Sequence, residues 1–557
     1  MTQRVQKPAR PRGAAATAAA ARWAAVQYGT GAPPAAESAE AVENTTATTS
    51  PKGSTPSLSS RPDVVVIDSD SEGGVNIPNR VEIPSDSEGS TEGETPEGVS
   101  PRENSASLLG VEMAPLADPP VATPPYQFQR VVPNEYTPPS ARHAALTVSM
   151  RDIFADPQLR HCALFSYNYD MPWLLSCFHG AIESIVTVSQ RGCVLPASPA
   201  DSPLSSCVHN IEVPMAPYTS HHTKMALCYY ADGTARVFLP SNNYMPAEVQ
   251  FPQQVCWSSP PLQLGGENNT LPNAFRDGLL AYLASYSPAH RGREVETHVA
   301  RRARTIDFAP LRDVPFVYSS PGGSAAAPAG IALLSREIRR GNLVSPPSTL
   351  HILAQTSSLG ARIGRTGDRA LFPDYWVPAV LPTGVDPTAC RPHILYPTLE
   401  QTMTDRRCLQ AAGWFHSSEG RSPEMHARLR AAGVFARSPA GTVPAHSKFY
   451  MQWHSGAEGE IPPSLDWCLY TSANLSKAAR GLPGGARPRN YEAGVLLRGP
   501  VECASFDERV AGGTRLGGSA AAFTVSLPFP RRFEQYAPAD RPTDAGLLDA
   551  LRERLGG

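Results

Sequence analysis

The chain has 557 residues, room for about two to four domains, and its 57 prolines, roughly twice the usual share, indicate that part of it does not pack. The 49 Lys and Arg nearly balance the 51 Asp and Glu, which excludes a uniformly basic coat protein for nucleic acid but allows a local basic groove. The 10 cysteines form no CxxC pair, and no apolar run reaches the ~18 residues that span a bilayer, which argues against a zinc ribbon, a disulfide scaffold and a membrane partner.

Residues 1–142 form the first predicted region. We expect this tail to be disordered because it is rich in Ala, Pro, Ser, Thr, Glu and Gly and has few aromatic residues. Its start carries bases and no acids, with Arg4, Lys7, Arg10 and Arg12. Such a start can be a mitochondrial transit peptide, but Pro8 and Pro11 would break an amphipathic helix. We therefore favour a nuclear import signal or a solvated basic arm, and expect a nuclear protein, with a mitochondrial fraction as the alternative.

An isolated aliphatic run lies in the acidic part of this tail, where Val64, Val65, Val66 and Ile67 precede Asp68. A run of this kind can add a strand to the edge of a partner's sheet, while the neighbouring acids meet basic residues there. It resembles a SUMO-interacting motif, and residues 81–88 resemble a weaker second copy. SUMO and SUMO-conjugated proteins are therefore expected partners. The alternative is an ordinary acidic tail with a chance aliphatic run.

Ordered sequence is predicted from residue 143 onward, because strand-like and helix-like stretches alternate to the end, as in α/β proteins. The predicted strands, in chain order, are 184–188, 224–230, 235–239, 349–355, 449–453, 466–471 and 493–497. The predicted helices are 273–284, 330–340 and 423–432. The Pro/Gly-rich stretches 319–328 and 481–488 are expected to be loops, the first near a domain junction.

One short pattern, His-x-Lys followed by a strand that ends near an Asn, occurs twice in the ordered region. The two copies consist of His222, Lys224 and Asn242, and of His446, Lys448 and Asn474. In a strand, residues i and i+2 share a face, so the His and Lys of each copy point the same way. A single copy could arise by chance. Two copies indicate a site where cations and amide donors surround a phosphate, while two histidines divide covalent and acid–base roles.

This constellation resembles the phospholipase D superfamily, whose signature is HxK with an Asp five positions after the Lys and a downstream Asn. Tyr229 and Trp453 occupy the two Asp positions in this chain. That departure fits the superfamily's tyrosyl-DNA phosphodiesterase branch, which acts at DNA 3′ ends. The stretches that match this branch are 165–174, 254–257, 355–360, 471–479 and 491–494. The resemblance covers roughly residues 144 to 530.

The resemblance implies an α/β fold of two similar α-β-α sandwich halves of phospholipase D type, related by pseudo-two-fold symmetry. The first half would span residues 143–345 and the second residues 346–557. It also implies a DNA repair hydrolase that acts on single-stranded 3′ ends in the manner of an exonuclease. Such an enzyme releases the tyrosine of a trapped type IB topoisomerase peptide, and other 3′ blocking groups, from a DNA 3′-phosphate through a phosphohistidine.

The resemblance assigns roles to the site residues. His222 would attack the phosphorus, His446 would act as general acid and then general base, and the Lys and Asn residues of both copies would hold the phosphate oxygens. Gln254 matches the family glutamine expected to orient His222 with a neutral carbonyl that leaves it unprotonated. Glu492 matches the acid expected to hold His446 and to favour its imidazolium.

The resemblance also suggests contacts to DNA. Tyr218 matches an aromatic that stacks on a base, and Tyr167, Ser357 and Ser358 match positions near the phosphate or the DNA backbone. Stacking is worth about 1–3 kcal/mol per base and tolerates any sequence. The alternative for the two tyrosines is a place in the core. No metal and no other cofactor is expected, because two lysines supply the charge, and a monomer is expected.

Two other functions remain open at this point. One is a different phosphodiesterase of the phospholipase D superfamily, acting on nucleic acid or phospholipid. The other is a scaffold homologue recruited by SUMO. The missing Asp disfavours the first, and the two intact HxK copies disfavour the second.

Overall fold

The computed structural model describes residues 126–265, 271–321, 327–341, 349–364, 367–454, 456–512 and 523–548. The tail up to residue 125, with the aliphatic run Val64 to Ile67, lies outside the described residues. Within the described ranges, no helix has the length and apolar character needed to cross a membrane.

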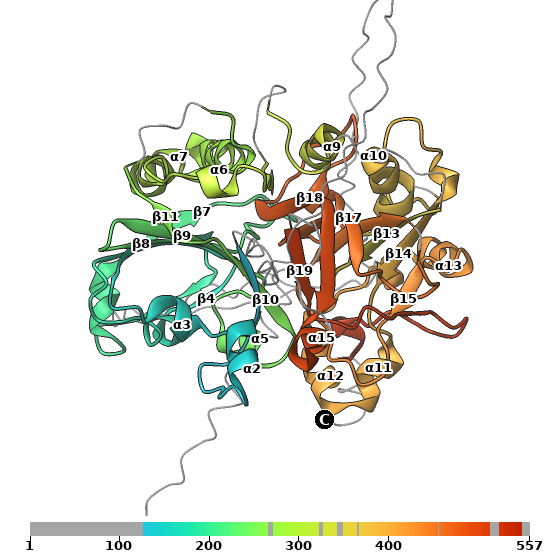
Figure 1. The fold of residues 1–557 in the computed structure, drawn as a ribbon, viewed down its shortest axis with the longest axis horizontal. Coiled ribbons are helices and arrows are strands. Elements are labelled where there is room, and N and C mark those ends of the chain that lie inside the picture. The colour runs from blue at the N-terminus through green and yellow to red at the C-terminus, as the bar shows by residue number, and fades with distance from the viewer. Residues whose placement is uncertain are drawn as a thin grey trace, which may run out of the picture. The chain divides into compact units, whose positions relative to one another are not determined.

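Two large mixed sheets dominate the described part of the chain (Figure 1). The first has the order β2-β1-β10-β9-β8-β3-β5-β7, with β11 paired to β9. Its strands are β1 (Gln127–Val131), β2 (Thr147–Val148), β3 (Leu159–Phe165), β5 (Ser184–Gln190), β7 (Val208–Val213), β8 (Met225–Tyr230), β9 (Thr234–Pro240), β10 (Gln254–Ser258) and β11 (Leu262–Gln263). A separate small sheet joins β4 (Tyr169–Asp170) to β6 (Val194–Leu195).

The second sheet has the order β12-β18-β17-β16-β13-β14-β15-β20, with β19 paired to β18. Its strands are β12 (Phe316–Ser319), β13 (Leu350–Gln355), β14 (Cys390–Leu395), β15 (Phe435–Arg437), β16 (Phe449–His454), β17 (Ser464–Thr471), β18 (Glu492–Ser505), β19 (Phe523–Leu527) and β20 (Glu534–Gln535). All seven predicted strands are confirmed, as β5, β8, β9, β13, β16, β17 and β18.

The two sheets share one topology. In each, the strand after HxK (β8 or β16) lies between an antiparallel hairpin partner (β9 or β17) and an antiparallel inner strand (β3 or β13). Two parallel strands continue each sheet on one side. On the other side, the hairpin partner pairs with β10 or β18, and further strands follow beyond these two. The expected α/β fold with two similar halves is therefore confirmed.

Helices are short and flank both sheets, so that Figure 1 shows α6 and α7 on one side of the first sheet and α3 and α5 on the other. Their bounds are α2 (Ala141–Leu146), α3 (Met150–Phe154), α4 (Met171–Leu175), α5 (Pro246–Gln250), α6 (Ala274–Ala284), α7 (Gly292–Val295), α8 (Arg301–Ala303), α9 (Ile331–Arg340), α10 (Val377–Val380), α11 (Leu399–Thr404), α12 (Arg406–Ala411), α13 (Pro423–Ala431), α14 (Lys477–Arg480) and α15 (Phe506–Ala511). The predicted helices are confirmed as α6, α9 and α13.

Both expected boundaries of the first half are wrong. Strand β1 pairs with β10 and β2, so the first half includes residues that were assigned to the tail before residue 143. Strand β12 pairs with β18, so the second half already begins by Phe316 rather than at residue 346. Both strands are short and bordered by proline, and β1 contains only two apolar residues, Phe128 and Val131, so the turn signals at their ends outweighed the strand pattern.

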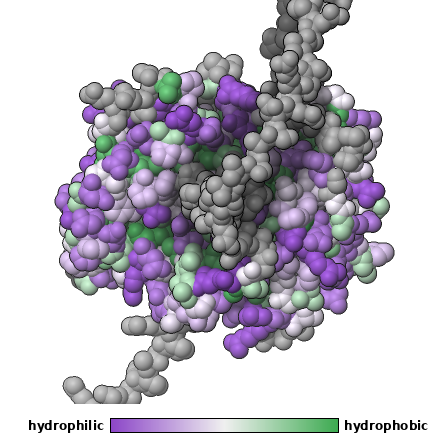
Figure 2. All heavy atoms as spheres, in the orientation of Figure 1, coloured by the Kyte–Doolittle hydropathy of each residue, from purple (hydrophilic) through white to green (hydrophobic). Residues whose placement is uncertain are grey.

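The two halves share one hydrophobic core, which contains residues from both sheets. Phe128 of β1 packs edge-on against Tyr470 of β17, with ring centroids 5.6 Å apart. The hydroxyl of Tyr470 donates to the carbonyl oxygens of Leu239 and Val255, at 2.9 and 2.7 Å, in the first sheet. A buried hydroxyl needs a hydrogen-bond partner, so Tyr470 fixes the second sheet against the first. On the face in Figure 2, hydrophilic side chains cover most of the described surface and hydrophobic ones form small separated patches.

Helix α6 joins the halves at a second place. It belongs to the first half, yet Gly278 on it packs directly on the backbone of Phe316 in β12. A Cβ atom at position 278 would overlap the carbonyl oxygen of Phe316 and lie 3.1 Å from its Cβ. The glycine therefore allows the helix to approach the strand this closely, because any side chain would push the two elements apart.

We expect Gly278→Ala to destabilise the protein by at least about 2 kcal/mol, as overpacking of a rigid backbone contact does. Urea unfolding would measure the loss. Gly413 provides a matched control, because an added Cβ there would meet nothing within 4 Å. If Gly278→Ala and Gly413→Ala unfold at the same urea concentration, the contact between α6 and β12 does not limit stability.

Candidate active site

The two HxK segments reach the seam between the sheets through two equivalent backbone contacts. The N–H of His222 donates to the carbonyl of Tyr491 at 2.9 Å, and the N–H of His446 donates to the carbonyl of Gln253 at 2.8 Å. Tyr491 and Gln253 each precede the first residue of the last major strand of the other half, β18 or β10. Each histidine is therefore attached to the half to which it does not belong.

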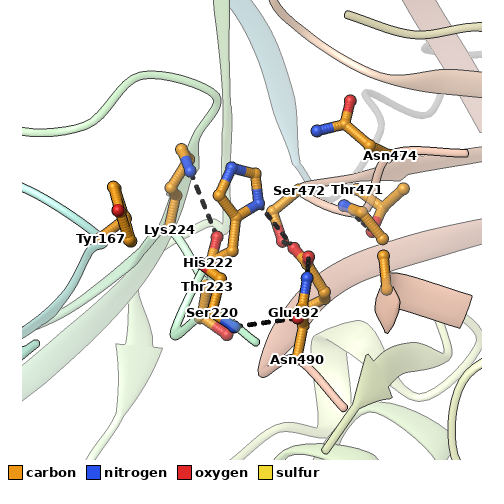
Figure 3. Close-up of polar contacts among 12 residues, drawn as sticks. Tyr167, Ser220, His222, Thr223, Lys224, Thr471, Ser472, Asn474, Asn490 and Glu492 are labelled. Atoms are coloured by element: carbon orange, nitrogen blue, oxygen red, sulfur yellow. Dashed lines mark hydrogen bonds and ion pairs between the residues drawn. The ribbon is translucent and has the colours of Figure 1, made fainter. Parts of the chain in front are cut away.

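The polar partners of the histidines are exchanged in the same way. Nδ1 of His222 lies 2.9 Å from Oε2 of Glu492 (Figure 3), and Nδ1 of His446 lies 3.2 Å from Nε2 of Gln254. The predicted assignment, Gln254 to His222 and Glu492 to His446, is therefore wrong. The cause is geometric: the residue after each backbone contact faces the histidine held there, and that residue belongs to the other half.

Glu492 fixes the tautomer of His222. Its Oε2 accepts from the hydroxyl of Ser472 at 2.6 Å, and its Oε1 accepts from Nδ2 of Asn490 at 3.2 Å (Figure 3). An ionised carboxylate only accepts hydrogen bonds, so the proton of neutral His222 lies on Nδ1. Its Nε2 then carries a lone pair, as a nucleophile requires.

The charges of this pair follow from burial and contact. Burial lowers the pKa of His222 to about 4, although Glu492 opposes the change. Burial would raise the pKa of Glu492, but the charge and hydrogen bond of His222, together with Ser472, lower it to about 2. At neutral pH the empty site therefore holds a neutral His222 beside an ionised Glu492.

Gln254 presents a donor to His446. Its Oε1 accepts from the hydroxyl of Ser241 at 2.6 Å, and its Nε2 donates to the carbonyl of Glu248 at 3.2 Å. The carbonyl of Glu248 can only accept, so the NH₂ group of Gln254 must face it and Oε1 must face the hydroxyl of Ser241. The second N–H of Gln254 therefore points at Nδ1 of His446. Burial first, then Lys448, lowers the pKa of His446 well below its usual value.

Both lysines are buried beside the histidines that they follow. The ammonium of Lys224 donates to the carbonyl of His222 at 3.2 Å, and that of Lys448 to the carbonyl of His446 at 2.6 Å. Burial lowers the pKa of Lys224 to about 8, and it lowers the pKa of Lys448 well below its usual value with the help of Lys224. An ammonium has three donors, so each lysine can also bind a phosphate oxygen.

The amide donor of the second half is Asn474, as predicted. Its Oδ1 accepts from the hydroxyl of Thr356 at 3.0 Å and from the backbone and side chain of Ser357 at 3.3 and 3.2 Å. Since its oxygen is occupied, Asn474 can offer only its NH₂ group to a ligand. Ser357, predicted to contact DNA, is fully buried and its hydroxyl holds this amide.

The amide donor of the first half is Asn243, and the prediction of Asn242 is wrong. The Oδ1 of Asn243 accepts from the hydroxyl of Ser166 and the N–H of Tyr167, at 3.0 and 3.2 Å, in the same way as Asn474. Asn242 points the other way, with its Nδ2 3.9 Å from the sulfur of Met150 in the core. Both asparagines lie just past the end of β9, and the bend there places Asn243, not Asn242, against Ser166 and Tyr167.

The other predicted contacts lie around this centre. Tyr167 is buried, with its ring centroid 6.4 Å from that of His222, so it lines the site without being exposed. Tyr218 is 77% exposed and has a left-handed backbone with φ of 60°. Ser358 is half-buried and forms a parallel bridge with His416.

Four residues near the centre were missed. Ser241 and Ser472 orient the partners of the histidines, and the shared spacing Ser241-x-Asn243 and Ser472-x-Asn474 would have revealed both serines and the correct asparagine. Glu248 is buried on α5 and binds Asn243, and no sequence pattern marks it. His416 lies near Lys448, and burial first, then Lys448, lowers its pKa to about 3.

Among the described residues, no group of three or more His, Cys, Asp or Glu side chains could hold a metal ion.

Two HxK halves that meet over one point, with two amide donors and one fixed nucleophilic nitrogen, define a phosphodiesterase of the phospholipase D superfamily. A family model described as tyrosyl-DNA phosphodiesterase matches residues 130–537. The chain therefore belongs to the tyrosyl-DNA phosphodiesterase family.

Individual proteins and a solved structure of this family are also similar to the chain. The chain is 33% identical over 433 residues to tyrosyl-DNA phosphodiesterase 1 of Saccharomyces cerevisiae, covering 69% of this chain and 77% of the relative. It is 24% identical over 438 residues to tyrosyl-DNA phosphodiesterase 1 of Drosophila melanogaster, covering 73% and 71%. The crystal structure of the yeast tyrosyl-DNA phosphodiesterase superposes with a TM-score of 0.64 at 30% identity, covering 75% of this chain and 99% of that one.

The adjacent asparagines offer a direct test of the site. We expect Asn243→Ala to lower kcat by about 10²–10³-fold, the usual cost of losing a donor to developing negative charge, and also to lower the unfolding temperature, because buried hydrogen bonds to Ser166, Tyr167 and Glu248 are lost. Asn242→Ala should leave kcat near the wild-type value and lower the unfolding temperature, because it removes core contacts. Steady-state kinetics on a 3′-phosphotyrosyl oligonucleotide would separate the two, with thermal unfolding to show that both variants are folded at the assay temperature. A large loss of kcat in Asn242→Ala but not in Asn243→Ala would show that Asn242 is the amide donor.

Proposed function

We propose that this chain hydrolyses the bond between a DNA 3′-phosphate and the tyrosine of a trapped type IB topoisomerase peptide, and that it also accepts other 3′ blocking groups. The observation that carries the proposal is the tautomer of His222, which Glu492 fixes through Nδ1 while Lys224 and Lys448 lie close enough for their charges to act on the ring. The decisive assay offers the purified protein an oligonucleotide with a 3′-phosphotyrosine and looks for release of a 3′-phosphate.

The chemistry proceeds in two displacements. In the first, Nε2 of His222 attacks phosphorus, the P–O bond to tyrosine breaks, and His446 gives its Nε2 proton to the leaving phenolate. In the second, water attacks phosphorus, the P–N bond breaks, and His446 takes the proton of that water. Lys224, Lys448 and the two amide donors hold the non-bridging oxygens while negative charge develops on them.

The role assignment stands on different grounds from those given by the sequence. His222 was expected to stay unprotonated because a glutamine would hold it. Instead, burial keeps it neutral, and Glu492 makes it a better nucleophile by accepting its Nδ1 proton. No step requires a metal or another cofactor, because the two lysines supply the positive charge.

Tyr218 is the best-placed residue to contact DNA. Its exposed ring offers a face on which a base of any sequence can stack, which suits an enzyme that meets arbitrary single-stranded 3′ ends. Tyr167 and Ser358 lie nearer the phosphate. The relatives' names refer to tyrosyl-DNA, and no observation favours a phospholipid or a purely scaffolding role.

The two histidine variants should differ. His222→Ala removes the attacking nitrogen, so no covalent adduct should form. With His446→Ala, phenolate (pKa ~10) still leaves, but water (pKa ~15.7) attacks slowly without a base. The phosphohistidine on His222 should therefore accumulate as an acid-labile, DNA-shifted band on a denaturing gel. Accumulation in His222→Ala instead would exchange the two roles.

We also propose that the tail recruits the enzyme without taking part in catalysis, that Val64 to Ile67 bind SUMO, and that the basic start directs the chain to the nucleus. Deletion of residues 1–120 should leave turnover of the oligonucleotide unchanged. The deletion must stop before Tyr126, because its hydroxyl accepts from the N–H of Thr524 at 3.1 Å.

Replacing Val65, Val66 and Ile67 with Ala should abolish SUMO binding in an NMR titration. If the wild-type tail and the tail with the three Ala substitutions bind SUMO equally, the motif is refuted.

A further inference from the structure

His446 needs an acceptor at Nδ1 that Gln254 does not provide. In the two displacements, which the proposed function requires, Nε2 of His446 first gives a proton and then takes one. The other ring nitrogen must therefore stay protonated throughout: an imidazolium before the first step, a neutral Nδ1–H ring between the steps, and an imidazolium again afterwards. A buried N–H without an acceptor is costly.

Gln254 is held in the opposite orientation. Its Oε1 is bound by Ser241, and one N–H of its amide is bound by the carbonyl of Glu248. Its other N–H faces Nδ1 of His446 at 3.2 Å. Rotating the amide to present its oxygen would break both other hydrogen bonds. Gln254 thus stabilises the resting ring of His446, whose proton lies on Nε2 and whose Nδ1 accepts a hydrogen bond. It destabilises the acid form, in which Nδ1 also carries a proton.

A carboxylate lies next to the same nitrogen. Oε2 of Glu248 is 3.9 Å from Nδ1 of His446, and the residue is 6% exposed. The carboxylate also accepts from the backbone N–H of Asn243 through Oε2 and from its Nδ2 through Oε1, both at 2.6 Å. Each carboxylate oxygen can accept two hydrogen bonds, so Oε2 can take a further one from His446.

We propose that Glu248 is a positioning residue for the general acid: it accepts the Nδ1–H of His446 whenever that nitrogen is protonated, while it holds the amide of Asn243 toward the phosphate. When substrate binds, His446 takes a proton from solvent at Nδ1 and its ring turns from Gln254 to Oε2 of Glu248; this proton returns to solvent after the product leaves. The P–N bond to His222 then forms as the P–O bond to tyrosine breaks, with the Nε2 proton passing to the phenolate oxygen. The ring that remains carries a free Nε2 lone pair, which takes the proton of the attacking water.

The surroundings of His446 make this counter-ion necessary. Apart from Glu248, the groups whose charge acts on the ring are Lys448, Lys224, His222 and His416, and each of them carries positive charge or can do so. The other buried carboxylate of the site, Glu492, is already hydrogen-bonded to His222. Glu248 acts on the same lysines, since its charge opposes the lowering of the pKa of both Lys224 and Lys448 by burial.

The test is Glu248→Gln, which keeps the shape and removes the charge. Turnover of the 3′-phosphotyrosyl oligonucleotide should fall by about tenfold or more at neutral pH, which corresponds to one unit in the pKa of the acid. It should recover as the pH is lowered, because the imidazolium then forms without a counter-ion. With p-nitrophenol as the leaving group, which needs less protonation, formation of the phosphohistidine in a single turnover should fall by less than about threefold.

Three variants separate this role from a structural one. Asn243→Ala should slow both leaving groups equally and leave the pH profile unshifted, so the same behaviour in Glu248→Gln would overturn the proposal. Glu248→Asp retains the charge and should recover part of the tyrosine-specific loss, even if Glu248→Gln unfolds. A Glu248→Asp variant with tyrosine-specific loss as large as that of Glu248→Gln would also overturn it.

Glu337→Gln controls for loss of a buried carboxylate elsewhere, because Glu337 lies on α9 in ion pairs with Arg336 and Arg340. It should show no dependence on the leaving group. Failure of the wild-type protein to cleave the phosphotyrosyl oligonucleotide at all would instead contradict the proposed function.

Discussion

The exchange of partners between the two halves is the contact on which the rest of the site depends. His222 is oriented by Glu492 of the second half, and His446 by Gln254 of the first. Neither histidine has its tautomer set by its own half. The shared core and the hydroxyl of Tyr470 therefore matter for chemistry as well as stability, because a small shift between the sheets would change both histidine contacts at once.

Because both halves belong to one chain, the residues beside the two histidines can differ, which is impossible in a symmetric dimer of identical chains. Two identical chains related by a true two-fold axis would place the same residue beside both histidines, and both rings would then favour the same tautomer. Within one chain the two positions carry Glu492 and Gln254. One ring thereby faces a carboxylate that accepts from its Nδ1, and the other faces an amide that donates to its Nδ1.

The fold was largely predictable because hydrophobic alternation is a local signal. All seven expected strands and all three expected helices are present, whereas other strands of the two sheets, among them β1, β3, β7, β10, β12 and β14, were not predicted. Strands β1 and β12 are short and bordered by turn residues. The HxK residues and Asn474 were predictable because they form a repeated pattern.

What could not be predicted was which half each partner faces, because residue spacing along the chain carries no information about how two sheets meet. The sequence also could not distinguish Asn242 from Asn243, because both lie at a bend past the end of β9, where no regular periodicity sets the direction of a side chain. Glu248 lies on a short helix outside every pattern, and only its hydrogen bonds to Asn243 reveal it.

Tyr218 adopts a strained backbone conformation although its side chain is not buried. A left-handed backbone costs a non-glycine residue about 1 kcal/mol or more, which a glycine would avoid, and the residue is 77% exposed. Because the ring is also exposed in the unfolded chain, its exposure neither stabilises nor destabilises the fold, and burial does not offset the backbone cost. The tyrosine thus weakens the free protein slightly, and a flat ligand laid against the ring can return that free energy as affinity.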